Sequence, residues 1–170
     1  AAIHRNPYLV SAYYQLGHSY NMKERYRESL ETYRNLALLH PDYARVSYNI
    51  GCVEMNLGRW REALPPFTRA VLQEDSPANR VKLAETYMML GDVRSMKREY
   101  AAAVSLDPAY FPAYDLMATH YLKEGKPTEA GQEYQKIVKK NPSCKEAHFS
   151  LGRLYENLHL WKESLSEYEK

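Results

Sequence analysis

The sequence predicts an all-α solenoid, a stack of antiparallel helix pairs, because two independent sets of residues recur with one period. The first set is an aromatic residue inside every second apolar segment: Tyr33, Phe67, Tyr100, Tyr134 and Tyr168. The second set is a small residue that follows an apolar one: Gly17, Gly51, Ala84, Ala118 and Gly152. Both sets have spacings of 34, 33, 34 and 34 residues. The second interval is thus one residue shorter in both sets, which indicates a single-residue deletion in one repeat.

Each period holds two helical patterns. In residues 13–20, apolar or small side chains recur at i, i+3, i+4 and i+7, which is one face of a helix. The second pattern starts after a short break and carries a small residue four positions before the aromatic. We expect a glycine such as Gly17 to let the partner helix approach closely, while the aromatic fills the space beside it. The deletion is expected in the turn over residues 73–80.

These residues resemble the tetratricopeptide repeat signature, and the resemblance covers the whole chain. Repeat 1 shows Y-x-x-L-G-x-x-Y over residues 13–20, and repeat 5 shows H-x-x-L-G-x-x-Y over residues 148–155. Repeat 2 departs from the signature by placing Glu54 where a tyrosine is usual, and repeat 3 by placing Met96 at a small position. The resemblance implies a right-handed α-solenoid in which the first helix of each pair lines a concave groove.

The same register divides the chain into segments. We expect the tail of a preceding repeat over 1–9, four repeats over 10–43, 44–76, 77–110 and 111–144, and a truncated fifth repeat over 145–170. The chain begins on Ala-Ala-Ile instead of methionine, which indicates a piece of a longer protein. No polar capping helix is expected at either end, and uncapped ends favour self-association.

Two prolines interrupt the second helix of repeat 2. Pro65 and Pro66 each remove a backbone donor, so we predict either a kink near residues 61–62 or a late helix start. Both are expected on the convex, solvent-facing side, where their role is local curvature. By contrast, Pro112 and Pro127 are expected in first turns, where proline is tolerated.

Composition and charge exclude several classes of function. The 23 basic and 21 acidic residues give a net charge of +2, which does not indicate a nucleic-acid or anionic-membrane partner. No apolar run has the roughly 18 residues that a membrane span needs, and no signal peptide opens the chain. The thiols Cys52 and Cys144 form neither a disulfide framework nor a zinc site. We therefore expect a soluble protein, in the cytoplasm by preference and in the periplasm as the alternative.

No catalytic motif is present, so the sequence predicts a non-enzymatic protein without cofactor or metal. The nearest pairing of a histidine with a carboxylate is His120 with Glu124, at i and i+4, and we interpret it as a contact at the edge of the core. Cys52 lies on the groove side of its helix, where we expect it to act as a small hydrophobe.

The groove positions that the resemblance implies suit a protein or peptide partner. Tyr14 and Tyr48 share one groove position with Phe149, and half-exposed aromatic rings provide contact area for a peptide. The remaining polar candidates on the first helices are His18, Asn21, Arg45, Asn49, Lys82, Glu85, Asp115 and Arg153. Their charges are mixed, so a uniformly acidic ligand is not indicated.

Co-chaperone members of this family clamp a peptide carboxylate with five residues. Asn49 and Lys82 match two of them, whereas Tyr14 and His18 stand at the first-repeat positions, so a clamp is not the preferred interpretation. We expect a scaffold or adaptor that binds a protein segment in the groove.

Two alternatives remain open at this stage. Residues 6–21 resemble the start of the repeat tails that follow the membrane domain of some bacterial O-antigen ligase-like proteins. The chain would then be an accessory module that positions a substrate for another domain. The second alternative is self-assembly through the uncapped ends. Activity of the full-length protein that survives deletion of the repeats would favour the scaffold.

Overall fold

The computed structural model describes residues 7–41 and 43–170, which fold into helices joined by short turns. Within these residues there are ten helices and no strand. In chain order they are α1 (Pro7–Met22), α2 (Tyr26–Leu39), α3 (Ala44–Asn56), α4 (Trp60–Gln73), α5 (Pro77–Met89), α6 (Val93–Leu106), α7 (Phe111–Lys123), α8 (Pro127–Lys140), α9 (Lys145–Asn157) and α10 (Trp161–Tyr168).

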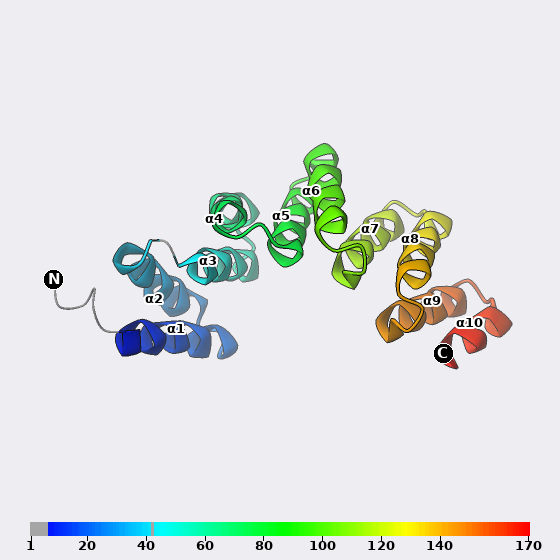
Figure 1. The fold of residues 1–170 in the computed structure, drawn as a ribbon, viewed down its shortest axis with the longest axis horizontal. Helices are drawn as coiled ribbons and strands as arrows, with labels where there is room; N and C mark the ends of the chain where they lie inside the picture. The colour runs from blue at the N-terminus through cyan, green and yellow to red at the C-terminus, as the bar shows by residue number, and fades with distance from the viewer. Residues whose placement is uncertain (1–6, 42) are drawn as a thin grey trace.

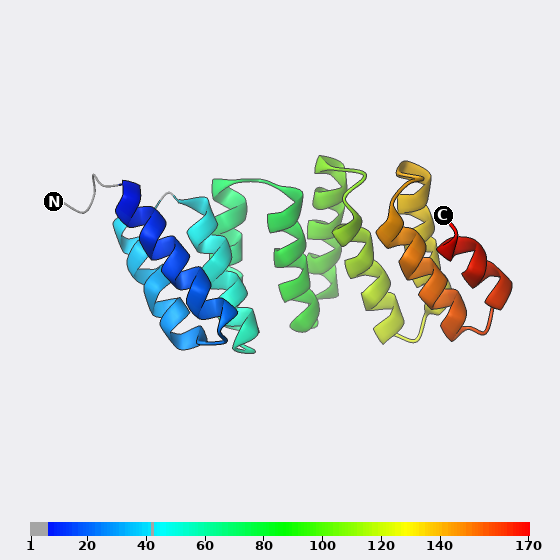
Figure 2. The same ribbon diagram turned by 90° about the horizontal axis from the view of Figure 1, so that it is seen from below.

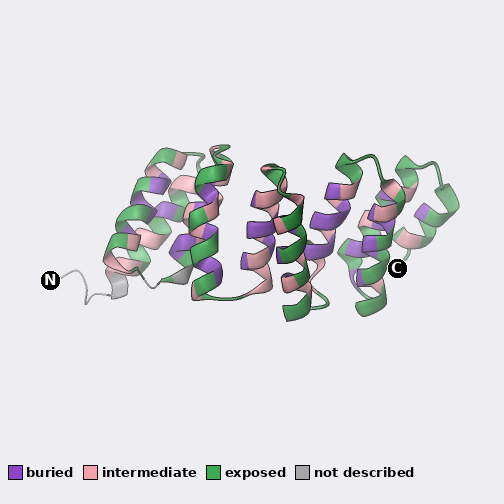
Figure 3. Cartoon of the chain, turned by 90° about the horizontal axis from the view of Figure 1, so that it is seen from above, coloured by how far each residue is buried: buried purple, intermediate pink, exposed green. Residues whose placement is uncertain are grey.

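Consecutive helices pack as antiparallel pairs, and the pairs stack into an arch (Figure 1). The odd-numbered helices lie along the inner side of the arch and the even-numbered helices along its outer side. The two ends of the chain lie at opposite ends of the stack (Figure 2). Buried residues, in purple, occur in helices all along the described part of the array (Figure 3). The predicted α-solenoid is confirmed.

The first helix begins earlier than the repeat register suggests. The expected tail of a preceding repeat covers residues 1–9, but α1 already starts at Pro7. A proline suits a first helical position because its fixed backbone angle is helical and the missing donor would have no partner there. The rest of the expected tail, residues 1–6, lies outside the described residues.

Helix α4 runs through both of its prolines. It extends from Trp60 to Gln73 with Pro65 and Pro66 inside it, so the expectation of a late helix start is wrong. Pro65 is exposed and Pro66 is half-buried, so the carbonyls that lose a donor lie near the solvent side. Burial of Phe67 and Ala70 on the other face holds the helix together. A bend inside this continuous helix stays a prediction.

The turn between α4 and α5 is one residue shorter than its counterparts. Three residues separate α4 from α5, whereas four separate α6 from α7 and α8 from α9. The deletion that shifts the period therefore falls in this turn, within the stretch that the sequence indicated. Ser76 caps α5 there, because its hydroxyl accepts a hydrogen bond from the backbone of Asn79 at 3.3 Å.

Close approach of paired helices depends on glycine. A methyl group added to Gly51 would lie 2.7 Å from Cζ of Phe67, so the ring fills the space that a side chain would need. Gly17 stands in the same relation to Tyr33. The Ser29 hydroxyl also donates to the carbonyl of Gly17 at 2.8 Å, which shows how closely α2 approaches α1. Glycine at these positions is therefore a packing requirement.

Side chains tie the turns between helix pairs to the array. The Tyr114 hydroxyl donates to the carbonyl of Pro108 at 2.9 Å, and Nε2 of His148, one period later, bonds the carbonyl of Pro142 at 2.9 Å. One period before Tyr114 stands Arg80, which instead pairs with Asp75 at 2.7 Å. All three contacts hold the turn that precedes the first helix of a pair.

Repeat 2 holds its turn from the other side. Ser47 occupies the position of Tyr114 in that repeat, and its short side chain makes no such bond. The carbonyl of Pro41 instead accepts bonds from Arg69 and Gln73 of α4, each at 2.8 Å. A different helix thus performs the same task in this repeat.

A carboxylate is buried where the other repeats carry a tyrosine. Glu54 of α3 is 1% exposed. Its carboxylate accepts a hydrogen bond from Nη2 of Arg34 at 2.8 Å and faces Nη1 of Arg59 at 3.6 Å. A buried charge is tolerated when it is paired, and these two arginines provide the pairing. The departure from the repeat signature is therefore compensated by one arginine of the preceding repeat and one of the same repeat.

Candidate functional site: the concave groove

The inner side of the arch contains a cavity between α3, α5 and α7. Its volume is about 430 Å³, which is in the range of pockets that hold a few side chains of a ligand. Four of the predicted groove residues, Tyr48, Lys82, Glu85 and Asp115, line it. The other lining residues are Ala78, Val81, Met88, Tyr110, Pro112, Leu116 and Thr119.

Two tyrosines contribute aromatic surface to this central cavity. The Tyr48 ring packs edge-on against Phe67, with ring centroids 5.8 Å apart, so the core holds it in place. Burial raises the pKa of Tyr48, which keeps its hydroxyl protonated. Tyr110 belongs to the turn between α6 and α7. The structure places it on the cavity wall, at the residue that precedes α7.

Among the described residues that line the central cavity, the only cation is Lys82, and it is already paired. Nζ of Lys82 donates to Oε2 of Glu85, one turn along α5, at 2.8 Å. Burial lowers the pKa of Lys82, but the hydrogen bond and the charge of Glu85 outweigh it, so the pKa lies above its usual value. The two side chains form an internal ion pair in the lining of the cavity.

Asp115 lies between this cavity and a second one. The second cavity has a volume of about 290 Å³ and lies between α7, α8 and α9. Asp115 and Thr119 line both cavities. Oδ1 of Asp115 accepts a hydrogen bond from the Tyr134 hydroxyl at 2.8 Å. Over residues 7–41 and 43–170, no cation lies within ion-pair distance of this carboxylate.

Asn49 carries a buried donor that no described residue satisfies. Its Nδ2 atom is buried and has no hydrogen-bond partner among the described residues. Asn49 follows Tyr48 in α3 and stands one period before Lys82, which lines the cavity. A buried donor without a partner costs about 1–3 kcal/mol of stability, and Asn49 lines neither of the two cavities.

The first-repeat candidates are spread along the inner side and do not converge on the cavity. Tyr14 packs edge-on against Tyr33 and Tyr43, with ring centroids 5.9 and 6.0 Å away. His18 is exposed. The side-chain oxygen of Asn21 accepts a hydrogen bond from Asn56 at 3.1 Å, which connects the two inner helices.

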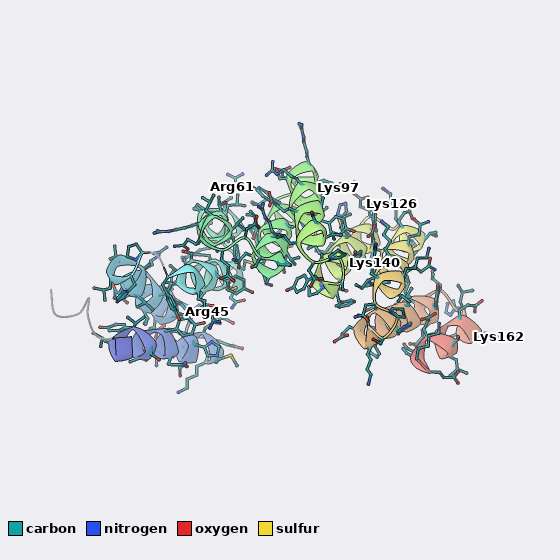
Figure 4. The ribbon with its side chains drawn as sticks, in the orientation of Figure 1. Arg45, Arg61, Lys97, Lys126, Lys140 and Lys162 are labelled. Atoms are coloured by element: carbon teal, nitrogen blue, oxygen red, sulfur yellow. The ribbon has the colours of Figure 1, made fainter. Side chains whose placement is uncertain are left out.

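Arg45 and the residues of α9 flank the two cavities. Arg45 is exposed and lies on the inner side beneath α3, whereas Arg61 of α4 lies on the outer side (Figure 4). At the other end, Phe149 is 56% exposed, and the guanidinium of Arg153 lies over its ring at 6.0 Å. Arg153 also lines the second cavity.

The chemistry of the remaining candidates is limited. Burial raises the pKa of the Cys52 thiol, which disfavours the nucleophilic thiolate. His120 is buried and lies 3.3 Å from Glu124, a contact at the edge of the core. Across the part of the chain that the structure describes, no group of three or more His, Cys, Asp or Glu residues is arranged to hold a metal ion. None of the described helices is long and apolar enough to cross a bilayer.

The stacked helix pairs and the grooved inner face define a helical-repeat protein. A family model of the tetratricopeptide repeat matches residues 14–80 and 116–170. The chain belongs to the tetratricopeptide repeat family, as its periodic residues predicted. Repeat arrays of this family are protein-interaction scaffolds, in agreement with the role expected from the sequence.

A curated relative is the tetratricopeptide repeat and J domain-containing co-chaperone DNJ1 of Fusarium oxysporum f. sp. lycopersici. It is 27% identical over 104 residues, which cover 58% of this chain and 20% of the relative. The chain thus spans about a fifth of the length of that co-chaperone.

Two solved structures share the fold. The thermophilic tetratricopeptide protein TTC0263 of Thermus thermophilus has a TM-score of 0.72 and 18% identity, over 94% of this chain and 88% of that one. YrrB, described as a tetratricopeptide protein with an unusual peptide-binding site, has a TM-score of 0.62 and 17% identity, over 91% of this chain and 80% of that one. At these identities the likeness concerns the fold alone.

Proposed function

We propose that the chain is a non-catalytic scaffold that binds a peptide or protein segment in its concave groove, centred on the cavity between α3, α5 and α7. The observation that carries this proposal is the cavity itself, whose lining combines two tyrosine rings with apolar side chains and a few polar groups. The helices that form it are held by the core, so a ligand meets a preformed surface. YrrB, a protein with the same fold, is described as having a peptide-binding site, which supports the proposal.

The test is selection of peptides from a random displayed library by the 170-residue chain. Binding of the selected peptides is then compared for Thr119→Lys and Trp161→Ala. Thr119 lines both cavities, so a lysine there fills the groove, and we expect affinity to fall by at least about tenfold, or 1.4 kcal/mol. Trp161 is exposed on α10, away from the groove, and its removal should leave affinity unchanged.

Thermal unfolding confirms that both variants are folded. Thr119 is half-buried beside an open cavity, so a lysine can direct its ammonium to solvent. Selected peptides that bind Thr119→Lys as tightly as the parent would refute the groove as the binding site. A library that yields no binding peptide would count against the proposal as a whole.

We also propose a second role, self-association through the outer face of α10. Trp161 is 61% and Leu165 is 59% exposed there. One period earlier, Gly131 at the position of Leu165 is buried against Leu154 of the next helix pair. The face of α10 therefore has the apolar character of a surface that another helix covers.

The molar mass of the 170-residue chain in solution tests this second role. We expect the weight-average mass measured by light scattering to rise with concentration, because an apolar helix face gains free energy by removal from water. Leu165→Glu should abolish the rise, whereas Lys162→Glu on the same helix should not. A monomer at every concentration would exclude association through α10.

A further inference from the structure

The charges that face the central cavity do not balance. Lys82, Glu85 and Asp115 line it, so one cation faces two carboxylates. The ammonium of Lys82 is neutralised by Glu85 at 2.8 Å. Asp115 receives only the neutral hydroxyl of Tyr134 on Oδ1, so its charge remains without an ionic partner. A ligand that enters this cavity therefore meets an uncompensated negative charge.

A second cation lines the neighbouring cavity. Arg153 shares that cavity with Asp115, and its guanidinium lies over the Phe149 ring at 6.0 Å. No ion pair within 4 Å joins it to Asp115 in the described part of the chain. The exposed Arg45 lies on α3 and does not line either cavity.

We infer that the segment bound in the groove presents an arginine or lysine side chain to Asp115, with the aliphatic part of that side chain lying in the central cavity. This inference rests on the proposed function and specifies its ligand. The cavity suits such a side chain, because its lining includes tyrosine rings, which attract a cation, and apolar residues that can cover the methylene groups. The Asp115 carboxylate provides a charge-assisted hydrogen-bond acceptor at the cavity wall.

An acidic ligand is disfavoured by the same contacts. A carboxylate would need Lys82 as its partner and would have to share the ammonium with Glu85. Glu85 and Asp115 would then both face the incoming negative charge. Removal of Lys82 is therefore expected to strengthen the binding of a basic ligand and to weaken the binding of an acidic one. A Lys82 variant thus distinguishes the two kinds of ligand.

The experiment measures binding of three labelled peptide pools to the 170-residue chain by fluorescence anisotropy. All peptides are nonamers, acetylated and amidated so that they carry no terminal charge, with flanks randomised among alanine, leucine, serine and tyrosine. The central residue is arginine in the first pool, citrulline in the second and glutamate in the third. Citrulline matches arginine in shape and lacks its charge. We expect the arginine pool to bind about tenfold more tightly than the citrulline pool.

Two variants of the chain assign the effect to the proposed contact. In Asp115→Asn the amide oxygen still accepts the bond from Tyr134, so the fold is kept, and we expect the preference for arginine to shrink to within about twofold. In Lys82→Met the carboxylate of Glu85 becomes available, and we expect the arginine pool to bind more tightly than to the parent. Thermal unfolding of both variants checks that they are folded.

The outcomes separate this inference from the groove proposal. If the arginine and citrulline pools bind equally well, the inference of a basic ligand is refuted. If that binding is lost in Thr119→Lys, the groove is still the binding site. Tightest binding of the glutamate pool, lost in Lys82→Met, would establish the opposite ligand chemistry. Failure of all three pools to bind would count against the groove itself.

Discussion

Replacing Phe67 by alanine is expected to lower the free energy of unfolding by about 3–5 kcal/mol, the range for removing a large aromatic from a core. Phe67 is fully buried, and its ring lies against the space above Gly51. Its loss would leave a cavity between α3 and α4 that glycine cannot fill. Because Phe67 also supports the Tyr48 ring, peptide binding should weaken as well.

Urea-induced unfolding followed by circular dichroism measures the effect. Leu72→Ala, in the same helix, is the matched control, because Leu72 is 82% exposed and its truncation should change stability by less than about 0.5 kcal/mol. A loss below about 1 kcal/mol for Phe67→Ala would contradict the packing of α3 against α4 described above.

Replacing Arg34 by methionine is expected to destabilise the chain by about 3 kcal/mol. The substitution leaves the buried Glu54 carboxylate with Arg59 alone, at 3.6 Å. Breaking a buried pair by removing one partner costs about 3–5 kcal/mol, and the lower end applies here because Arg34 itself is largely exposed.

A double-mutant cycle separates the buried charge from simple loss of the arginine. Glu54→Tyr restores the residue that the other repeats carry at this position, and we expect it to be neutral or stabilising. In that background Arg34→Met should cost less than about 1 kcal/mol. An equal cost of Arg34→Met in both backgrounds would show that the ion pair does not stabilise this repeat.

Periodic residues predicted the helices well, because the features that define them are local. A small residue and an aromatic 16 positions later identify each helix pair, as for Gly51 and Phe67. The proline pair in α4 led to a wrong alternative, since tertiary burial of Phe67 and Ala70 outweighs the lost backbone bonds. Helix propensity accounts for the hydrogen bonds lost at the prolines but not for the burial of apolar side chains, so it could not predict which effect is larger.

The candidate groove was harder to predict than the fold. Helical spacing brings Lys82 close to Glu85, so their pairing could have been read from a separation of three residues. Tyr110 gave no such signal, because a turn residue reaches the cavity only through the way α5 and α7 pack. The contact of Asp115 with Tyr134 likewise joins residues of two helices that are 19 positions apart in the chain, so it needs the three-dimensional structure.

The side chains that hold the turns have a consequence for engineering this array. Repeats of this family can be recombined in engineered arrays, since every helix pair has the same backbone fold. Repeat 2, however, secures the Pro41 carbonyl with Arg69 and Gln73 of its second helix, whereas repeats 4 and 5 secure the equivalent carbonyl from the first helix. A chimera that exchanges single helices between repeats would leave one turn without a donor and another with two, so only whole helix pairs with their preceding turn are interchangeable parts.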